Sequence, residues 1–208
     1  DNASYALAIG TGSPVTSTGG ANITMTTDSF VLAGSITSSS GTVTVQNMTA
    51  GTLITVGGSA TDVRTTSPKT MVVDSTELGK ITAATTVIGR KDAAGAGNIT
   101  TSTLSMDALG KAGGNLSLLT GGDITLGAAI TKSGATNAKL TLDANNRVIL
   151  SYRIGRASGD TTSTGNLDVD VFARGSAQTA AQGSVVVNNI IDARAGLVNI
   201  DAVSTTGW

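Results

Sequence analysis

The chain has 208 residues and a net charge of −1, and only 13% of its residues are charged and 2% aromatic, both low fractions for a globular domain. Histidine and cysteine are absent, which excludes zinc sites built on Cys or His, disulfide frameworks, thiol nucleophiles and Ser-His-Asp triads. No basic cluster offers a footprint for nucleic acid or anionic lipid, and no stretch reaches the ~18 apolar residues of a membrane helix. We therefore expect no nucleic-acid partner and no membrane insertion.

A repeated pattern predicts short strands along the chain: glycine is followed two residues later by Ile, Val or Leu. The glycines that begin this pattern are Gly34, Gly41, Gly51, Gly79, Gly97, Gly114, Gly122, Gly165 and Gly183. In several copies the apolar residue recurs two positions further on, as in Val43 and Val45 or Leu116 and Leu118. Such alternation, bounded by Gly, Ser, Asn or Asp, is typical of half-buried strands. The chain is predicted to be almost entirely β.

In chain order, strands are expected near residues 23–25, 30–32, 43–45, 53–56, 99–101, 116–118, 124–126, 140–142, 148–150, 167–171 and 185–187. An irregular period near 20 residues, with extra strand-like pieces in each unit, favours a β-solenoid of about nine or ten stacked coils and a rod of about 45 Å. Glycine, Asn and Asp would occupy the corners, including the asparagines of the five Asn-x-Ser/Thr sequons, Asn2, Asn22, Asn47, Asn98 and Asn115.

A β-sandwich or Greek-key barrel is the alternative architecture. Such folds usually place several Trp or Tyr residues in the core and use Asn-Gly or Asp-Gly hairpin turns. This chain has one Trp, two Tyr and two Phe and contains neither dipeptide. The solenoid is therefore the preferred prediction.

Two segments carry a family resemblance: residues 33–45 (AGSITSSSGTVTV) and 114–126 (GNLSLLTGGDITL). They resemble the repeats of filamentous haemagglutinin-like exoproteins, bacterial adhesins exported by two-partner secretion, and the likeness extends over roughly residues 20 to 203. The resemblance implies an all-β, right-handed parallel β-helix at the bacterial cell surface or secreted. It also implies an outer-membrane transporter as partner of the full-length protein. Asn-Pro-Asn motifs of the family's secretion domain are missing, so residues 1–208 are expected to be one shaft segment of a larger exoprotein.

Two regions interrupt the repeat and predict excursions from the helix. Residues 60–93 hold nine of the 27 charged residues and Pro68, one of only two prolines. Residues 151–165 form the second, a predicted loop that includes the run from Tyr152 to Arg156. Insertions between coils map to loops, which often carry recognition.

The candidate binding residues lie in these two regions, because Arg and aromatic side chains supply most interaction hot spots. They are Arg64, Lys69, Arg90, Lys91, Tyr152, Arg153 and Arg156. With Lys80, the basic residues of the first region are expected to be largely exposed, and Arg147, Arg153 and Arg156 are expected to form a loose basic group. The expected partner is a glycan or protein receptor on a host or bacterial surface.

Catalytic, metal and cofactor sites are not predicted. Polysaccharide-cleaving β-helix enzymes need clustered acids or an Arg or Lys base, and Asp168 with Asp170 is the only close acidic pair. These two carboxylates are expected on the outer face of one strand, with Leu167, Val169 and Val171 pointing inward. The calcium-binding Gly-Gly-x-Gly-x-Asp repeat is absent, and Gly121-Gly-Asp is only a fragment of it.

The sequence thus predicts a non-catalytic structural and adhesive segment that presents recognition loops on a rigid shaft. Two alternatives stay open: a carbohydrate-active β-helix enzyme, and the stalk of a contact-dependent toxin delivery protein. Ice binding by flat threonine rows is a weaker alternative, because Thr-x-Thr occurs at Thr24 and Thr42, about one coil apart, but does not persist at that spacing in later coils.

Overall fold

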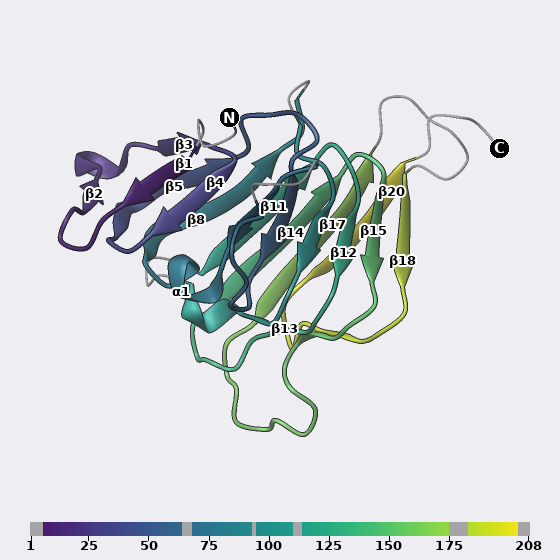
Figure 1. Cartoon of the computed structure of the whole chain (residues 1–208). Coiled ribbons are helices and arrows are strands. Elements are labelled where there is room, and N and C mark those ends of the chain that lie inside the picture. The colour runs from purple at the N-terminus through teal and green to yellow at the C-terminus, as the bar shows by residue number, and fades with distance from the viewer. Residues whose placement is uncertain (1–5, 64–67, 93–94, 110–113, 175–182, 204–208) are drawn as a thin grey trace.

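The computed structural model describes residues 6–63, 68–92, 95–109, 114–174 and 183–203, which form an all-β structure of parallel strands in stacked sheets (Figure 1). The long sheet contains β2 (Val15–Thr16), β5 (Ile36–Gln46), β8 (Ile81–Arg90), β11 (Asn115–Thr120), β14 (Ala138–Ala144), β17 (Leu167–Arg174) and β20 (Val198–Val203), and β3 (Ile23–Thr26) also pairs with β5. The predicted β class and its parallel strand pairing are confirmed.

Three smaller sheets accompany the long sheet. The six-stranded sheet contains β18 (Ser184–Val187), β15 (Arg147–Leu150), β12 (Ile124–Leu126), β9 (Ile99–Thr101), β6 (Leu53–Val56) and β7 (Thr70–Val73). The four-stranded sheet contains β10 (Leu104–Ser105), β13 (Ile130–Thr131), β16 (Ile154–Gly155) and β19 (Ile191–Asp192). The two-stranded sheet pairs β1 (Ala6–Ile9) with β4 (Ser29–Leu32). The three short helices of the described residues are η1 (Thr18–Gly20), α1 (Ser75–Leu78) and η2 (Met106–Ala108).

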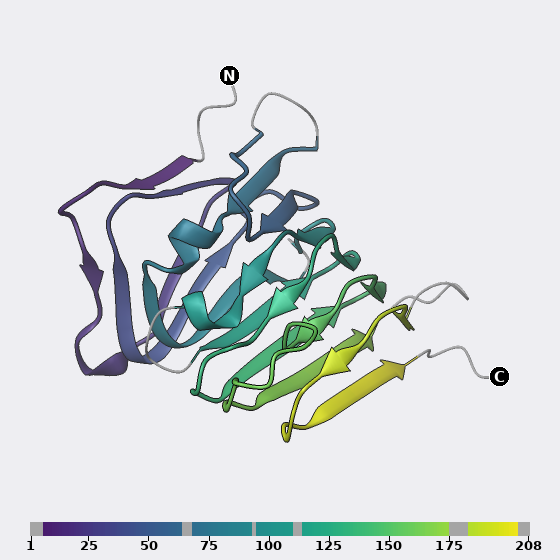
Figure 2. The same ribbon diagram turned by 90° about the horizontal axis from the view of Figure 1, so that it is seen from below.

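From β8 onward the chain visits the long, six-stranded and four-stranded sheets in the same order each time. We call one such passage a level: β8–β9–β10, β11–β12–β13, β14–β15–β16 and β17–β18–β19 are four successive levels. Figure 2, seen from below, shows them following one another from the N-terminal side toward β20. Neighbouring levels are joined by parallel ladders in each sheet.

The core is a set of aliphatic rows that run from level to level. Leu118 stands in register with Leu142, and Leu142 with Val171, and all three side chains are 0% exposed. The alternation in the sequence produces this arrangement because every second side chain of a strand points to the same face. β17 accordingly alternates buried and half-buried positions, as predicted for Leu167, Val169 and Val171.

Asparagine side chains join the levels at the corners. Asn115 Oδ1 accepts a hydrogen bond from Lys139 N at 3.0 Å, and Asn98 Oδ1 accepts one from Asp123 N at 3.0 Å. Before the first level, Asn22 Oδ1 likewise accepts one from Thr42 N at 2.8 Å, next to the pairing of β3 with β5. The corner role predicted for these three sequon residues is confirmed, and Asn2 lies outside the described residues.

The number of levels is smaller than the nine or ten coils predicted. The long sheet has seven strands along its path among the described residues, so its first and last strands are about 29 Å apart at ~4.8 Å per strand. The predicted period near 20 residues is too short because it counts the strands at residues 99–101 and 185–187, which belong to the six-stranded sheet, together with strands of the long sheet. Within the long sheet, Leu140 pairs with Val169, a separation of 29 residues.

The predicted excursion at 60–93 is wrong for most of its length. β8 is a central strand of the long sheet, with Ile81 and Ile88 buried, and β7 buries Met71 and Val73. The prediction failed because Gly79, just before β8, is the only glycine of this span that begins the repeat, and β7 has none. Among the described residues of this range, residues 60–63 and α1 lie outside the sheets, and Val63 is exposed.

The second predicted loop, 151–165, contains one short strand. β16 pairs with β13 and β19, so the irregular connection begins after Gly155 and continues to β17 (Figure 1). Asp160 braces this connection from within, because its Oδ1 accepts hydrogen bonds from Thr162 N at 2.8 Å and Ser163 N at 3.2 Å.

Candidate recognition surface

The four-stranded sheet and the connections beside it form the best candidate surface for recognition. Its inward residues, Leu104, Ile130, Ile154 and Ile191, are in register and pack toward the core. The outward partners are Ser105, Thr131, Gly155 and Asp192. Small outward side chains leave room there for the longer charged residues of the flanking connections.

Two of the predicted binding residues meet on this surface. Arg153 Nη2 lies 2.9 Å from Asp192 Oδ2, and Arg156 Nη2 lies 3.2 Å from Asp192 Oδ1. Burial opposes the charge of Asp192, but hydrogen bonds from Arg156 and from the Arg194 backbone, with both arginine charges, outweigh it and lower the pKa of this carboxyl. One acid therefore balances two guanidinium groups, and the cluster retains positive charge.

An aromatic ring lies next to this cluster in the chain. Tyr152 is 46% exposed, whereas the side chains of Arg153 and Arg156 are about a quarter exposed. We call Tyr152, Arg153, Arg156 and Asp192 the arginine cluster. Arg147, which the sequence grouped with these arginines, is instead on β15 and forms an ion pair with Asp123 at 2.7 Å.

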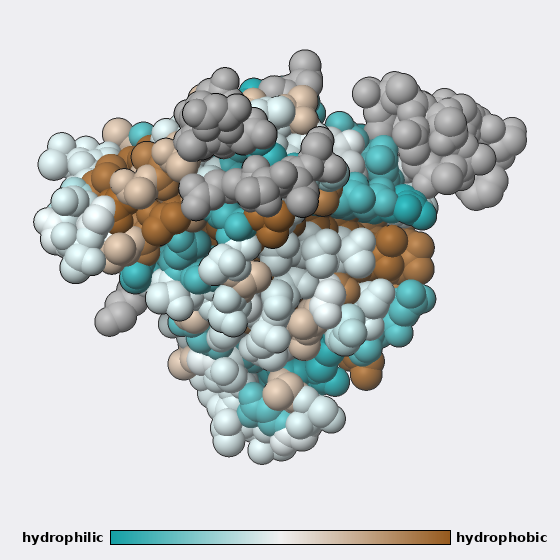
Figure 3. Space-filling model, in the orientation of Figure 1, coloured by the Kyte–Doolittle hydropathy of each residue, from teal (hydrophilic) through white to brown (hydrophobic). Residues whose placement is uncertain are grey.

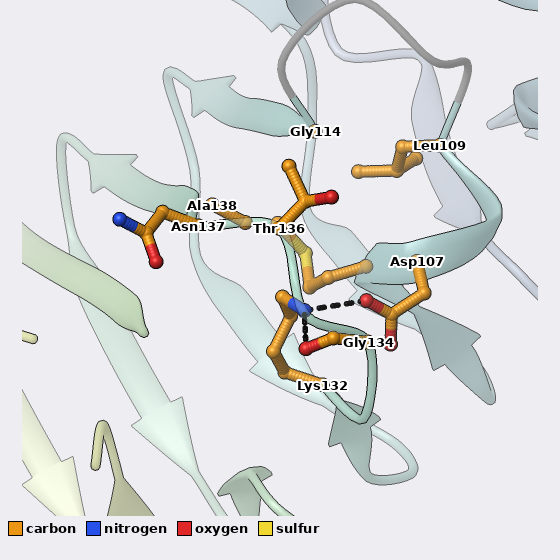
Figure 4. Close-up of a pocket in the computed structure, with 9 residues that line it drawn as sticks. Asp107, Leu109, Gly114, Lys132, Gly134, Thr136, Asn137 and Ala138 are labelled. Carbon is orange, nitrogen blue, oxygen red and sulfur yellow. Dashed lines mark hydrogen bonds and ion pairs between the residues drawn. The ribbon is translucent and has the colours of Figure 1, made fainter. Parts of the chain in front are cut away.

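A pocket of about 280 Å³ opens beside the same sheet, between η2 and the connection after β13 (Figure 4). Its lining residues include Met106, Asp107, Leu109, Lys132, Thr136 and Asn137. Lys132 is only 2% exposed, although lysine is rarely buried. The sequence pattern does not single out Lys132, because a lysine directly after a two-residue strand resembles any solvated loop lysine.

The charged groups of the pocket are engaged with each other. Lys132 Nζ donates to Asp107 Oδ1 at 2.6 Å and to Gly134 O at 2.8 Å. Asp107 Oδ2 accepts a hydrogen bond from Ser133 N at 2.6 Å. Burial opposes the charge of Asp107, but the bonds from Lys132, Ser133 and Gly134 outweigh it and lower the pKa of the carboxyl. This arrangement fastens the connection after β13 to the level before it.

The remaining predicted binding residues are dispersed and paired. Lys69 lies 4.0 Å from Asp28, Lys91 lies 2.6 Å from Asp143, Arg90 pairs with Asp92, and Lys80 Nζ donates to Leu32 O at 2.8 Å. The expectation that these cations are largely exposed is wrong, because each folds back onto a carboxylate or carbonyl of the chain. Arg64 lies outside the described residues.

A second cavity, of about 390 Å³, lies between β4 and β7 and is lined by acidic residues. Asp62 Oδ2 accepts from Phe30 N at 3.0 Å and its Oδ1 accepts from Val72 N at 2.6 Å. Glu77 Oε1 accepts from Leu32 N at 2.8 Å. These carboxylates bridge two strands that do not pair directly, so they act as linkers between the two-stranded and six-stranded sheets.

The environment of Glu77 changes its acidity. Burial raises the pKa of Glu77, hydrogen bonds from Leu32 and Asp74 backbone N–H groups oppose this, and the charges of Asp74 and Asp62 add to the increase. Glu77 also completes a capping box at α1, in which Glu77 N donates to Asp74 Oδ1 at 2.7 Å.

Asp168 and Asp170 lie on the outer face of β17, as predicted. Asp170 pairs with Lys139 at 2.7 Å, and Asp168 Oδ1 accepts a hydrogen bond from Leu197 N at 2.8 Å. Over the described ranges, no group of three or more acidic residues is placed to hold a metal ion. In that same part of the chain, no helix has the length and apolar character to cross a membrane.

Comparisons with protein-family models, curated proteins and solved structures gave no match to this chain.

Proposed function

We propose that the chain is a segment of a right-handed parallel β-helix and serves as a non-catalytic shaft of a secreted bacterial surface exoprotein. The observation that supports this proposal best is the register of the aliphatic rows, in which each level repeats the inward positions of the level before it. Such stacking makes a stiff rod, because every level is fixed by ladders in more than one sheet. The family resemblance adds the setting at the cell surface and the transporter partner.

In this proposal the arginine cluster is the part of the shaft that contacts a receptor. Arg153 and Arg156 present charged hydrogen-bond donors in a fixed arrangement around Asp192, and Tyr152, the residue before Arg153 in the chain, is exposed. Guanidinium groups bind carboxylates and sulfates bidentately, and aromatic rings pack against sugar faces. An acidic glycan on a host or bacterial surface is therefore the partner that this chemistry fits.

A glycan-binding measurement with matched variants tests the proposal. Sulfated and uronic-acid glycans immobilised on a surface should capture the wild-type chain, and Arg153→Ala with Arg156→Ala should reduce capture at least tenfold. Arg147→Ala is the control, because Arg147 also pairs with one aspartate but lies on the six-stranded sheet. Equal loss with the control, or unchanged capture by the double variant, would overturn the role of the cluster.

A carbohydrate-active enzyme is the second candidate, and the cavity at Asp62 and Glu77 is the observation that favours it. A partly buried glutamate with a raised pKa has the property of a general acid in glycoside cleavage. Incubation with a panel of polysaccharides distinguishes the two functions: the shaft proposal requires no product. Release of sugar that Glu77→Gln abolishes would favour the enzyme instead.

A further inference from the structure

The pocket beside η2 combines a buried ion pair with an apolar floor. Lys132 Nζ lies 2.6 Å from Asp107 Oδ1, and the side chain of the lysine is 2% exposed. Met106 and Leu109 line the same pocket. Ligand sites in proteins have this composition, because apolar residues exclude water while a few fixed polar groups orient the bound molecule.

The apolar lining is not part of an exposed hydrophobic surface. Met106 is 1% exposed and Leu109 is 5% exposed. Figure 3 shows mainly neutral and hydrophilic colours on the lower half of the face seen in Figure 1, where α1 and β13 lie. The two side chains therefore offer their apolar surface inside the pocket and not on the outside of the molecule.

Lys132 keeps hydrogen-bonding capacity for a ligand. An ammonium group has three N–H donors, and among the described residues its Nζ donates to two acceptors, Asp107 Oδ1 and Gly134 O. Thr136 adds a hydroxyl group, which can both donate and accept. Figure 4 shows the side chains of Lys132, Thr136 and Leu109 turned toward a common space and that of Asn137 turned away from it. One donor and one hydroxyl group are thus available above the apolar floor.

The charges of the pocket favour a neutral ligand. Asp107 balances Lys132, and its second oxygen accepts hydrogen bonds from Ser133 N at 2.6 Å and Ser133 Oγ at 3.1 Å. A charged ligand would have to compete with this ion pair and leave one of its members without compensation, which is costly for a buried charge. A molecule with hydroxyl groups satisfies the remaining N–H of the lysine and leaves the pair intact.

The volume of the pocket limits the size of the ligand. It is about 280 Å³, just below the roughly 300–1,000 Å³ that is usual for sites of drug-sized ligands. One sugar ring belongs to this size class. Its C–H face would pack on Met106 and Leu109, and its hydroxyl groups would reach Lys132 and Thr136.

The pocket is separate from the arginine cluster. Its ion pair lies in η2 and directly after β13, whereas the arginine cluster lies around β16 and β19. Lys132 N donates to Gly155 O at 3.0 Å, so the pocket and the arginine cluster are on neighbouring levels. The two sites also differ in charge, because the pocket is balanced and the cluster has two arginines for one acid.

We propose that this pocket binds a single neutral sugar ring, which accepts a hydrogen bond from Lys132, exchanges one with Thr136 and packs on Met106 and Leu109. The inference goes beyond the proposed function and does not depend on it. The arginine cluster is proposed to recognise negative charge, and the pocket requires none.

Calorimetric titration with the methyl glycosides of glucose, galactose and mannose, one at a time, tests the inference. At least one of them is expected to bind saturably, with a dissociation constant in the millimolar range that is typical of so small a ligand. Thr136→Val should weaken binding at least threefold, and Thr136→Phe, which fills the pocket, should abolish it. Thr161→Phe is the matched control, because Thr161 is also an exposed threonine of a connection but does not line the pocket.

Amide chemical shifts give a second measurement that does not rely on the variants. In the wild-type chain the Lys132 and Gly134 amides should shift during the titration, while those of β20 should not. Arg153→Ala with Arg156→Ala should bind the glycoside as the wild type does, which separates this site from the proposed function. The inference would be overturned by absence of saturable binding of all three glycosides, by undiminished binding to Thr136→Phe, or by shifts confined to the arginine cluster.

Discussion

Lys132 and Asp107 form an ion pair that joins two successive levels, with Nζ 2.6 Å from Oδ1 and the lysine almost completely buried. The lysine follows β13, and the aspartate lies in η2 directly after β10, the strand that pairs with β13. Because removal of one partner leaves a buried charge without compensation, this pair should matter more for stability than the exposed ion pairs of the long sheet.

Asp107→Asn is therefore expected to lower the free energy of unfolding by about 3 kcal/mol, as measured by urea denaturation. The control Lys139→Gln removes one partner of the more exposed pair with Asp170 and should cost about 1 kcal/mol or less. The double variant Asp107→Asn with Lys132→Met should recover part of the loss. Equal costs for the two single variants would contradict the structural role of the buried pair.

Acid should destabilise the fold through Asp28. Burial opposes the charge of Asp28, but hydrogen bonds from Thr49, Met48 and Thr52 outweigh it and lower the pKa of the carboxyl. A pKa that is lower in the folded state stabilises the fold above the unfolded-state pKa, and this stability is lost as pH falls through the folded-state pKa.

Asp28→Asn should thus be less stable than wild type at pH 7, by about 1–3 kcal/mol, because the N–H groups of Met48 and Thr49 lose an ionised acceptor. The difference should shrink as the pH is lowered below about 4, the usual aspartate pKa. Urea unfolding curves of both proteins between pH 3 and pH 7 measure it. A gap that stays constant over this range would show that ionisation of Asp28 does not stabilise the fold.

Gly155 should tolerate no side chain. Its φ of +106° is unfavourable for other residues, and a Cβ there would collide with the carbonyl oxygen of Asp192 on the neighbouring strand. Gly159 is the matched control, since its φ is +80° but no atom lies within 4 Å of the Cβ position. Gly155→Ala should cost clearly more than the 1–2 kcal/mol expected for Gly159→Ala, as measured by thermal unfolding. Similar losses of stability in the two variants would contradict the close approach of β16 and β19 in the structure.

Core truncations should depend on position along the stack. Leu142 lies in the middle of an aliphatic row and is fully buried, so Leu142→Ala should cost about 3 kcal/mol or more. Ile200→Ala, on the end strand β20 where the side chain is 44% exposed, should cost about 1 kcal/mol. A reversed order would contradict the placement of the two residues.

The sequence predicts the strands of the central levels well, because alternation at Leu116 and Leu118 or at Leu140 and Leu142 is a direct consequence of a one-sided burial pattern. It does not predict which sheet a strand joins. Ile99 and Leu116 have the same local pattern but lie in different sheets, since pairing depends on partners about 25 to 30 residues away. The predicted number of coils is too high because the patterns at Ile99 and Leu116 are each taken as a separate coil.

The partners of charged residues are harder to predict from the sequence than the burial of apolar residues. Lys91 was expected in solvent, but its partner, Asp143, is 52 residues away in the chain and approaches it only when the levels stack. Lys132 and Asp107 are likewise separated by one level. In contrast, Arg153 and Arg156 are near neighbours in sequence and their proximity was predicted, although the acid between them, Asp192, was not.

Cysteine cross-linking tests the parallel register of the levels most directly, because the natural chain contains no cysteine. Ser117 and Thr141 are outward-facing partners on β11 and β14, so Ser117→Cys with Thr141→Cys should form a disulfide readily on mild oxidation. In the control, Ser117→Cys with Lys139→Cys, the second cysteine is two residues out of register, which places the Cα atoms about 8 Å apart, beyond the reach of a disulfide. Efficient cross-linking of the first pair only, counted by mass spectrometry of the unfolded protein, is the predicted result. Equal cross-linking of both pairs, or none in the first, would contradict the stacked parallel arrangement.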